Sequence, residues 1–243
     1  MSMFFFVFLG WFCGSVVGGA TGLGAMMIAL PILSLGIPAS QAVLVSCLVG
    51  SVACIQLGWL YRKYVVWSDM KWMWIGCIPG CIFGALTLKV VPVDWLQLMI
   101  SFMIFCFILV QLFSRKAQWK LGDSVAWNAL AGFGGGFANA SVSVVGVPVG
   151  IFVLLKRWDR DRARSCMSMF FLFSGWVTVA SQWTAGLYDF SLVKLAAIGL
   201  AGSLIGQRLG FRIGRHLDQK LFVRVVLLFL SCAAVTLFYK GMQ

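Results

Sequence analysis

Small and polar residues interrupt two long apolar runs, and their types and spacing could bind a solute. The first interruption extends from Gly18 to Gly24 and reads Gly-Gly-Ala-Thr-Gly-Leu-Gly, and the second extends from Asn139 to Pro148. Glycine and proline release backbone groups from the helical ladder. Such groups persist at membrane depth only where protein or a water-filled cavity covers them. Secondary transporters build their substrate sites at breaks of this kind.

The chemistry that these breaks favour is the binding of a small anion. Free N–H groups at a helix N-terminus attract negative charge without a buried arginine. Helical arms beginning near Gly24 and Gly146 would direct such groups toward the membrane midplane. Nearby hydroxyl and amide side chains would complete the site, or would only cap the broken helices and allow close helix packing. Ser46 and Ser168 hold matching positions in the following runs and would flank the breaks. The candidate substrate contacts are Thr21, Gly22, Gly24, Ser46, Asn139, Ser141, Ser143, Gly146, Pro148 and Ser168.

Other chemistries lack the residues that they need. The one histidine, His216, and the eight cysteines show no paired metal-ligand spacing, so we expect neither a metal site nor a cofactor. Cys77 and Cys81 lie one helical turn apart, and we interpret them as small buried hydrophobic residues rather than as a thiol pair. There is no phosphate-binding loop for ATP. No carboxylates or histidines cluster beside the apolar runs, so we do not expect an enzyme.

The composition places both breaks in a polytopic membrane protein. Of the 243 residues 61% are apolar and 11% are charged, whereas a soluble domain carries about a quarter charged residues. A bilayer core about 30 Å thick needs roughly 20 apolar residues for each helical crossing. Eight runs satisfy this requirement, namely 3–36, 40–60, 71–91, 95–114, 125–155, 165–185, 190–211 and 221–240. Only the first and fifth are much longer than one crossing.

The order of one long and three short runs occurs twice. It predicts an internal duplication with a period of about 121 to 124 residues. Matches such as Gly14 with Gly135 accompany the repeated order. We therefore expect a first repeat over 1–114, a polar linker over 115–124 and a second repeat over 125–243.

The basic residues distinguish two topologies. If all eight runs crossed the membrane, Lys and Arg would divide 11 against 8 between its faces. If 3–36 and 125–155 are re-entrant hairpins, the division is 16 against 3, with Lys89, Lys194 and Lys240 alone on the minor face. Because cytoplasmic connectors collect basic residues, we expect the hairpin topology, a cytoplasmic linker and two periplasmic termini. A kinked full span is the alternative for each long run.

The fold predicted from these patterns is all-α. It consists of two inverted repeats, each a glycine-broken re-entrant helical hairpin followed by three transmembrane helices. An odd number of crossings in each half makes the halves inverted copies, and this arrangement places a substrate site at their interface.

Residues at both breaks resemble the TauE/SafE sulfite exporter family. The stretch from Gly14 to Gly24, with Pro31 behind it, is similar to the opening repeat of that family. Gly146-Val-Pro148 followed by residues 149–155 is similar to the second repeat. The resemblance covers nearly the whole chain. The sequence departs from the family where Ala25 follows Gly24 in place of a glycine triplet, and in a second break that is rich in Asn and Ser.

The resemblance implies a small sulfur-containing anion, either sulfite or an organosulfonate, as the cargo. It also implies a multi-pass protein of the inner membrane, in contact with the lipid bilayer. The basic residues lie in short connectors, where they act as topology signals, so we expect no nucleic-acid partner. A homo-oligomer stays an open alternative.

The direction of transport is inferred from the absence of carboxylates and histidine inside the apolar runs, where a proton relay would need them. An anion that leaves a negative interior gains roughly 2.3 kcal/mol per charge per 100 mV, so export could run on membrane potential alone. Import would need a cotransported cation, which backbone carbonyls could bind. We expect a secondary transporter that exports the anion by alternating access. The alternatives are an anion channel of the same architecture, an importer of a small sulfur-containing or carboxylate anion, and a membrane scaffold or insertion factor without cargo.

Overall fold

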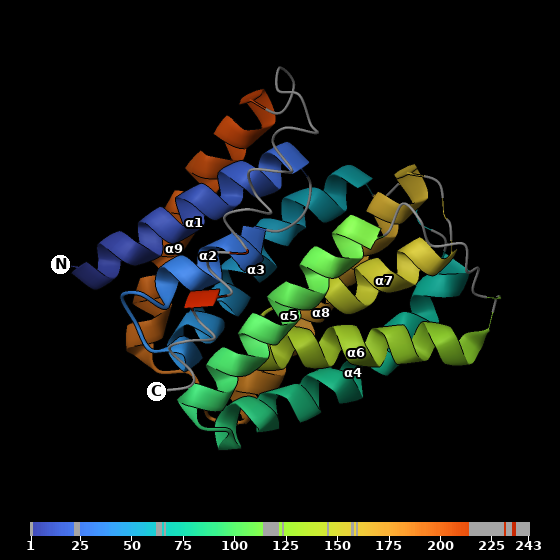
Figure 1. The fold of residues 1–243 in the computed structure, drawn as a ribbon, viewed down its shortest axis with the longest axis horizontal. Helices are drawn as coiled ribbons and strands as arrows, with labels where there is room; N and C mark the ends of the chain where they lie inside the picture. Colours follow the sequence, from blue (N-terminus) through green and yellow to red (C-terminus); the bar gives the residue numbers. More distant parts are fainter. Residues whose placement is uncertain are drawn as a thin grey trace.

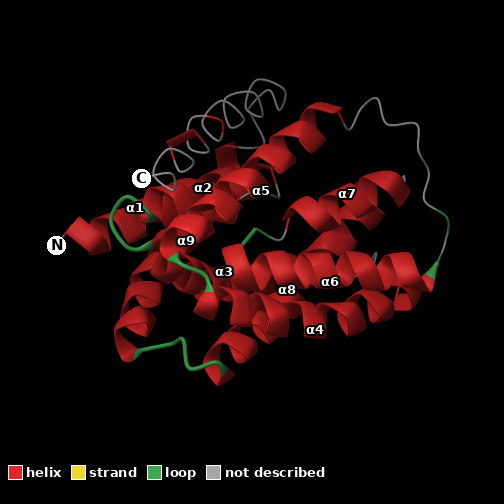
Figure 2. Cartoon of the chain, turned by 60° about the horizontal axis from the view of Figure 1, so that its bottom comes forward, coloured by secondary structure: helices red, strands yellow, loops and turns green. Residues whose placement is uncertain are grey.

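The computed structural model describes most of the chain, and all of the regular structure in that part is helical (Figures 1 and 2). The described residues are 2–21, 25–61, 65, 67–113, 122, 124–144, 146–156, 158, 160–213, 231 and 235–236. Most of the expected helix 221–240 and most of the linker 115–124 lie outside these residues.

The helices follow the predicted apolar runs. In chain order they are α1 (Ser2–Thr21), α2 (Ala25–Leu33), α3 (Ala39–Tyr61), α4 (Trp67–Val90), α5 (Val93–Phe113), α6 (Val125–Val142), α7 (Gly146–Lys156), α8 (Arg160–Thr184) and α9 (Phe190–Ile213). Three of them contain stretches long and apolar enough to cross a membrane, namely Met3–Ala20, Met70–Val90 and Phe190–Ile213. Shorter apolar stretches lie over Ala39–Ile55 and Val93–Cys106. The chain therefore has the structure of a helical membrane protein.

Each of the two long runs forms two helices separated by a short break. The first run ends one helix at Thr21 and begins the next at Ala25. The two helices pack against each other, because glycines on α1 face α2: a methyl group on Gly14 would lie 3.1 Å from Ala29 Cβ. The arms are unequal, with 20 residues in α1 and nine in α2. At 1.5 Å per residue α2 is less than half as long as α1.

The second run breaks just after α6. Ser143 adopts the left-handed conformation, with φ 56° and ψ 31°. Its N–H donates to Asn139 O at 2.9 Å, and the Val144 N–H donates to Ala138 O at 3.2 Å. α7 then begins at Gly146. Pro148 lies in the first turn of α7, where the N–H that proline lacks would have no partner within the helix.

Glycines allow two pairs of helices to pack closely. α4 lies against α6, and α1 lies against α9. The contacts join Gly76, Gly80 and Gly84 of α4 to the backbones of Ala129, Phe133 and Phe137, and Gly202, Gly206 and Gly210 of α9 to those of Phe8, Phe12 and Val16. In both pairs the residue numbers rise together, so the paired helices run parallel. Small residues that bring two backbones together are the usual basis of helix association in membranes.

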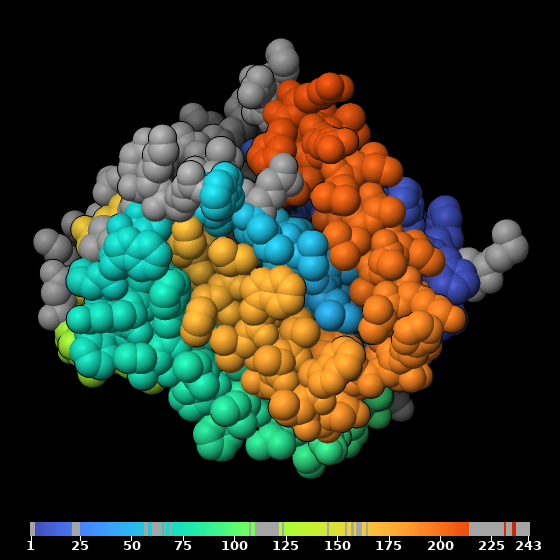
Figure 3. Space-filling model, turned by 180° about the vertical axis from the view of Figure 1, so that it is seen from behind, coloured from blue at the N-terminus to red at the C-terminus, as the bar shows by residue number. Residues whose placement is uncertain are grey.

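Two further long helices, α3 and α8, lie between these two pairs (Figure 1). Seen from behind, α8 occupies the surface between α4 and α9, with α3 beside it (Figure 3). They contact each other closely, since a methyl group on Gly175 of α8 would lie 2.7 Å from Ser51 Oγ of α3. α3 and α8 therefore join the two pairs, and the end of α6 before the second break is held against both of them.

We predict that an added methyl group separates α4 from α6. In Gly84→Ala the new Cβ would lie 2.6 Å from Phe137 O and 2.9 Å from Ala140 Cβ, so the free energy of unfolding should fall by about 1–3 kcal/mol. Thermal unfolding of the purified protein measures the change. Gly150→Ala is the matched control, because its Cβ would meet nothing within 4 Å among the described atoms. Equal melting temperatures for the two variants would contradict the close packing.

Candidate functional site

Asn139, near the end of α6, is the centre of a buried polar cluster. Its side chain is fully buried. Asn139 Nδ2 donates to Thr178 Oγ1 at 3.0 Å and to Ser174 Oγ at 3.4 Å, and both acceptors lie on α8. The backbone carbonyl of Asn139 accepts the Cys47 thiol of α3 at 3.5 Å. Its side-chain oxygen, Oδ1, has no partner among the described atoms. Asn139 therefore links three helices and keeps one polar atom uncommitted.

A second amide, Gln182, continues the cluster along α8. Gln182 is fully buried. Its Nε2 donates to the backbone carbonyl of Ala140 at 2.8 Å, and the Tyr188 hydroxyl donates to its Oε1 at 2.7 Å. A glutamine inside an apolar run is costly to expose to lipid, and both polar atoms of Gln182 have partners inside the bundle. Gln56 also lies inside an apolar run, and its side chain is outside the described residues.

The structure brings the second break against the start of α2. Ser143 Oγ lies 3.6 Å from Met26 Sδ, and a methyl group on Gly146 would lie 2.9 Å from Met27 Cε. The second break and the start of α2 thus meet through methionine side chains. These flexible, polarizable side chains fill irregular space and can be displaced more easily than branched ones.

The other predicted contacts differ in their surroundings. Ser46 is fully buried on α3, and its hydroxyl has no described partner. Ser141 is equally buried, but its hydroxyl donates to Phe137 O of its own helix at 2.7 Å. Ser168 is buried on α8, about 9 Å along the helix axis from Ser174. Thus Ser46 offers a free hydroxyl, whereas the hydroxyl of Ser141 is already bonded.

The remaining predicted contacts lie at the edges of the breaks. Pro148 is half-buried on α7, next to Gly134 of α6. Thr21 is the last residue of α1, but its side chain and the whole of Gly22 and Gly24 lie outside the described residues. Their proposed contact with a substrate stays a prediction.

Sequence reasoning missed the residues of α8 that pair with Asn139. Ser174 and Thr178 are followed at the same spacing by Gln182, so the three residues form one polar stripe along the apolar part of α8 that follows its charged start. That spacing is visible in the sequence and could have identified the stripe. Its partner was not visible, because the helix that faces a stripe depends on the tertiary fold.

Neutral hydrogen-bonding groups make up the cluster. Cys81 Sγ lies 3.3 Å from Thr178 Oγ1 and 3.6 Å from Cys77 Sγ, so hydroxyl and thiol groups extend it toward α4. Among the described residues there is no group of three His, Cys, Asp or Glu side chains that could hold a metal ion. The arrangement combines a helix N-terminus at Gly146 with hydroxyl and amide donors. Such donors suit the binding of a small anion.

We predict that the hydrogen bond between Asn139 and Thr178 stabilises the fold. Thr178→Val keeps the shape of the side chain but removes the acceptor, so the melting temperature of the purified protein should fall. The expected loss is about 0.6 kcal/mol and at most about 1.7 kcal/mol, the average and the maximum measured for interhelical hydrogen bonds in a membrane protein. Thr178→Ser keeps the hydroxyl and should lose less. A Thr178→Val variant as stable as Thr178→Ser would show that this hydrogen bond contributes little.

The comparison with known protein families identifies the chain. Searches of curated proteins and of solved structures give no match. The sequence does match the family described as "Sulfite exporter TauE/SafE" over residues 7–237, which is nearly its whole length. The match includes both helix breaks, the polar cluster around Asn139 and the helices that hold them. The chain belongs to the TauE/SafE sulfite exporter family of membrane transport proteins.

Proposed function

We propose that this protein is a secondary transporter that exports a small sulfur-containing anion, sulfite or an organosulfonate, across the inner membrane by alternating access. The observation that carries the proposal is the buried neutral cluster around Asn139, which lies at a helix break and retains uncommitted polar atoms. Buried polar groups are normally satisfied, so uncommitted ones point to a ligand. The family described as sulfite exporters supplies the class of anion.

Asn139 can present donors to an anion without losing its neighbours. The hydroxyls of Ser174 and Thr178 can each donate or accept a hydrogen bond. Half a turn of the Asn139 amide would therefore let Oδ1 accept from Thr178, and from Ser174 once its hydroxyl leaves Phe171 O, and would free the Nδ2 hydrogens for the anion. Ser46, Ser143 and the N-terminus of α7 would supply further donors. Thr21, Gly22 and Gly24 would contribute from the first break.

The contacts among helix ends support the hairpin topology. Lys89 Nζ, near the end of α4, donates to Ala185 O just after α8 at 2.9 Å, so the α4–α5 and α8–α9 connections meet at one end of the molecule. If every apolar run crossed the membrane once, these connections would lie on opposite faces. They lie on one face if 125–155 enters and leaves on the same side. We assign this end to the periplasm, together with both termini.

The glycine contacts support inverted repeats with the boundaries 1–114 and 125–243. α4 packs on α6 as α9 packs on α1, which is the pairing that a two-fold relation between the halves requires. Gly80 faces Phe133 and Gly206 faces Phe12. Phe133 and Phe12 are 121 residues apart, one repeat period. On this basis Gly80 of α4 corresponds to Gly206 of α9.

We predict that membrane potential alone drives the flux. In proteoliposomes loaded with labelled sulfite, an imposed potential should drive efflux from the negative compartment without a proton or sodium gradient. The expected driving force is about 2.3 kcal/mol per charge per 100 mV. Counterflow would distinguish a carrier from a channel of the same architecture. A strict requirement for either gradient would show that a coupling site exists, and no flux of any anion would favour a scaffold.

We predict that the Ser143 hydroxyl contacts the anion. Ser143→Gly accepts the left-handed conformation without steric cost, whereas Ser143→Ala does not. Both remove the hydroxyl, so both should weaken sulfite binding by roughly 10- to 150-fold, the effect of one hydrogen bond to a charged group. Calorimetry on folded, purified variants measures the affinity.

The control for this comparison is Thr87→Ala, because the Thr87 hydroxyl bonds only to Phe83 O of its own helix in the described contacts. If Ser143→Gly binds as tightly as this control while Ser143→Ala binds weakly, the backbone conformation matters and the hydroxyl does not. If Ser143→Gly, Ser143→Ala and Asn139→Ala all bind as tightly as the control, the substrate site lies elsewhere.

A further inference from the structure

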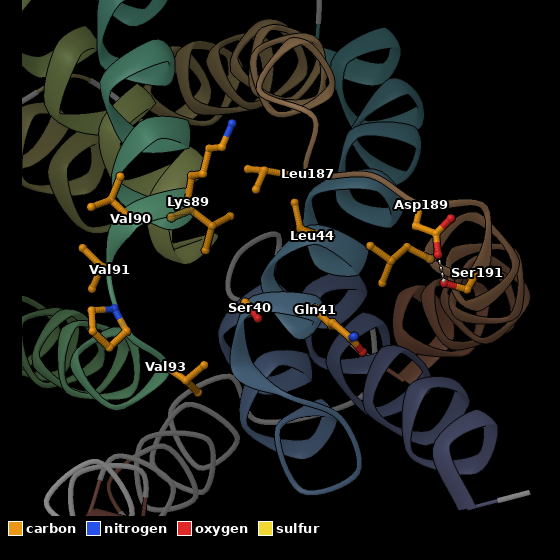
Figure 4. A pocket seen from close by; sticks show the side chains of 13 residues that line it. Ser40, Gln41, Leu44, Lys89, Val90, Val91, Val93, Leu187, Asp189 and Ser191 are labelled. Atoms are coloured by element: carbon orange, nitrogen blue, oxygen red, sulfur yellow. Dashed lines mark hydrogen bonds between the residues drawn. The ribbon is translucent and has the colours of Figure 1, made fainter.

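A pocket of ≈ 580 Å³ lies where three connections between helices converge. Its walls come from the start of α3, from the α4–α5 connection and from the segment between α8 and α9 (Figure 4). The polar residues on these walls are Ser40, Gln41, Lys89, Asp189 and Ser191. The pocket is at the end of the molecule that we assign to the periplasm.

The charged groups of the pocket are unequally available to a solute. Both oxygens of Asp189 are engaged at the start of α9: Oδ1 accepts the Phe190 N–H at 2.6 Å, and Oδ2 accepts the Ser191 hydroxyl at 3.0 Å. Lys89 is exposed, and its ammonium group donates one hydrogen bond to Ala185 O. An ammonium group has three donors, so the others are left for a ligand. The donors that Lys89 keeps free suit an oxyanion, and the two hydrogen bonds that Asp189 accepts reduce the repulsion from its carboxylate.

A chain of hydrogen bonds separates the pocket from the cluster around Asn139. Leu44 lines the pocket, and its backbone carbonyl lies 3.3 Å from the Tyr188 hydroxyl. That hydroxyl also donates to Gln182 Oε1 at 2.7 Å, and Gln182 Nε2 donates to Ala140 O at 2.8 Å. Ala140 is the neighbour of Asn139 on α6. Tyr188 and Gln182 thus join the wall of the pocket to the second helix break.

The bridge has the properties of a contact that can open. Tyr188 has one hydroxyl hydrogen for two acceptors, so one of its two contacts can be released at a time. Burial raises the pKa of Tyr188 above its usual value, so the hydroxyl keeps that hydrogen. Behind the bridge lies Cys47, which is 1% exposed and 3.6 Å from Gln182 Nε2. Cys47 is also one helical turn beyond Leu44, the residue that lines the pocket.

We propose that this pocket is the outer vestibule of the transport path, where Lys89 attracts a small oxyanion, and that the Tyr188–Gln182 bridge is the gate between the vestibule and the Asn139 cluster. The proposal rests on the proposed function. In the described structure the gate is closed, because the bridge is formed and Cys47 is buried. The anion would pass from the cluster to the vestibule when the bridge breaks.

Cys47 is a natural reporter of this gate. Its thiolate attacks 2-sulfonatoethyl methanethiosulfonate, a membrane-impermeant anion, to form a mixed disulfide and release methanesulfinate. Reagent is added to spheroplasts of an expressing bacterium, and modified Cys47 is quantified by peptide mass spectrometry, with Cys47→Ala as the blank. Tyr188→Phe keeps the ring but removes the hydroxyl, so Cys47 should react roughly 2- to 13-fold faster, the effect of one net hydrogen bond. Methanesulfonate should slow this reaction.

The matched control is Thr184→Val, which removes a hydroxyl bonded to Ser181 O in the same segment but leaves the bridge intact. It should react at the wild-type rate. Equal rates in Tyr188→Phe and wild type would overturn the gate and leave the anion site at Asn139 unaffected. A faster reaction that methanesulfonate does not slow would overturn the path for the anion.

A second measurement does not depend on folding of Tyr188→Phe. The same reagent, added from outside, should modify Ser40→Cys rapidly and block anion efflux, and a thiol reductant should restore it. Full efflux after complete modification would show that the pocket is not part of the transport path. Modification of Ser40→Cys only in inside-out vesicles would overturn its outward position together with the proposed topology.

Discussion

Backbone N–H and C=O groups inside a bilayer need partners within the protein, and this requirement governs the breaks on which transport would depend. At the second break the partners are present. The N–H groups of Ser143 and Val144 return to α6, while the carbonyls of Asn139 and Ala140 accept hydrogen bonds from Cys47 and Gln182. The break is thus held by α3 and α8, so these backbone groups have hydrogen-bond partners within the protein and do not face lipid. A polar opening at this depth is stable because helices distant in sequence cover it.

The close packing of the glycine-rich helices positions α3 and α8 over the break. α4 lies on α6, and α9 lies on α1, with backbones close enough that added methyl groups at Gly84 or Gly202 would come within 2.6 Å of a carbonyl oxygen. These contacts form two parallel pairs on either side of α3 and α8. In alternating access, such pairs can move as units while contacts between units break and reform. The Tyr188–Gln182 bridge is one of the contacts that would break and reform, because it joins the α8–α9 connection to the second helix break.

The sequence predicts the positions of the breaks better than their surroundings. Glycine, proline and small residues locate the end of α1 at Thr21 and the end of α6 at Val142 closely, because the local backbone decides where a helix can continue. The nine-residue length of α2 and the approach of Met26 to Ser143 depend on tertiary packing, which periodicity does not record. Ser141 shows the same limit on a smaller scale. Its type suggests a ligand contact, but its hydroxyl bonds to its own helix.

The central claim is that a small anion binds beside Asn139, at the break between α6 and α7. The most direct measurement is a crystal structure of the protein soaked with selenite, an analogue of sulfite whose selenium scatters anomalously. The account predicts a selenium peak beside the Asn139 amide and the N-terminus of α7, with selenite oxygens within hydrogen-bonding distance of the Ser143 hydroxyl. An ordered selenium peak elsewhere in the helix bundle, with none beside Asn139, would contradict it.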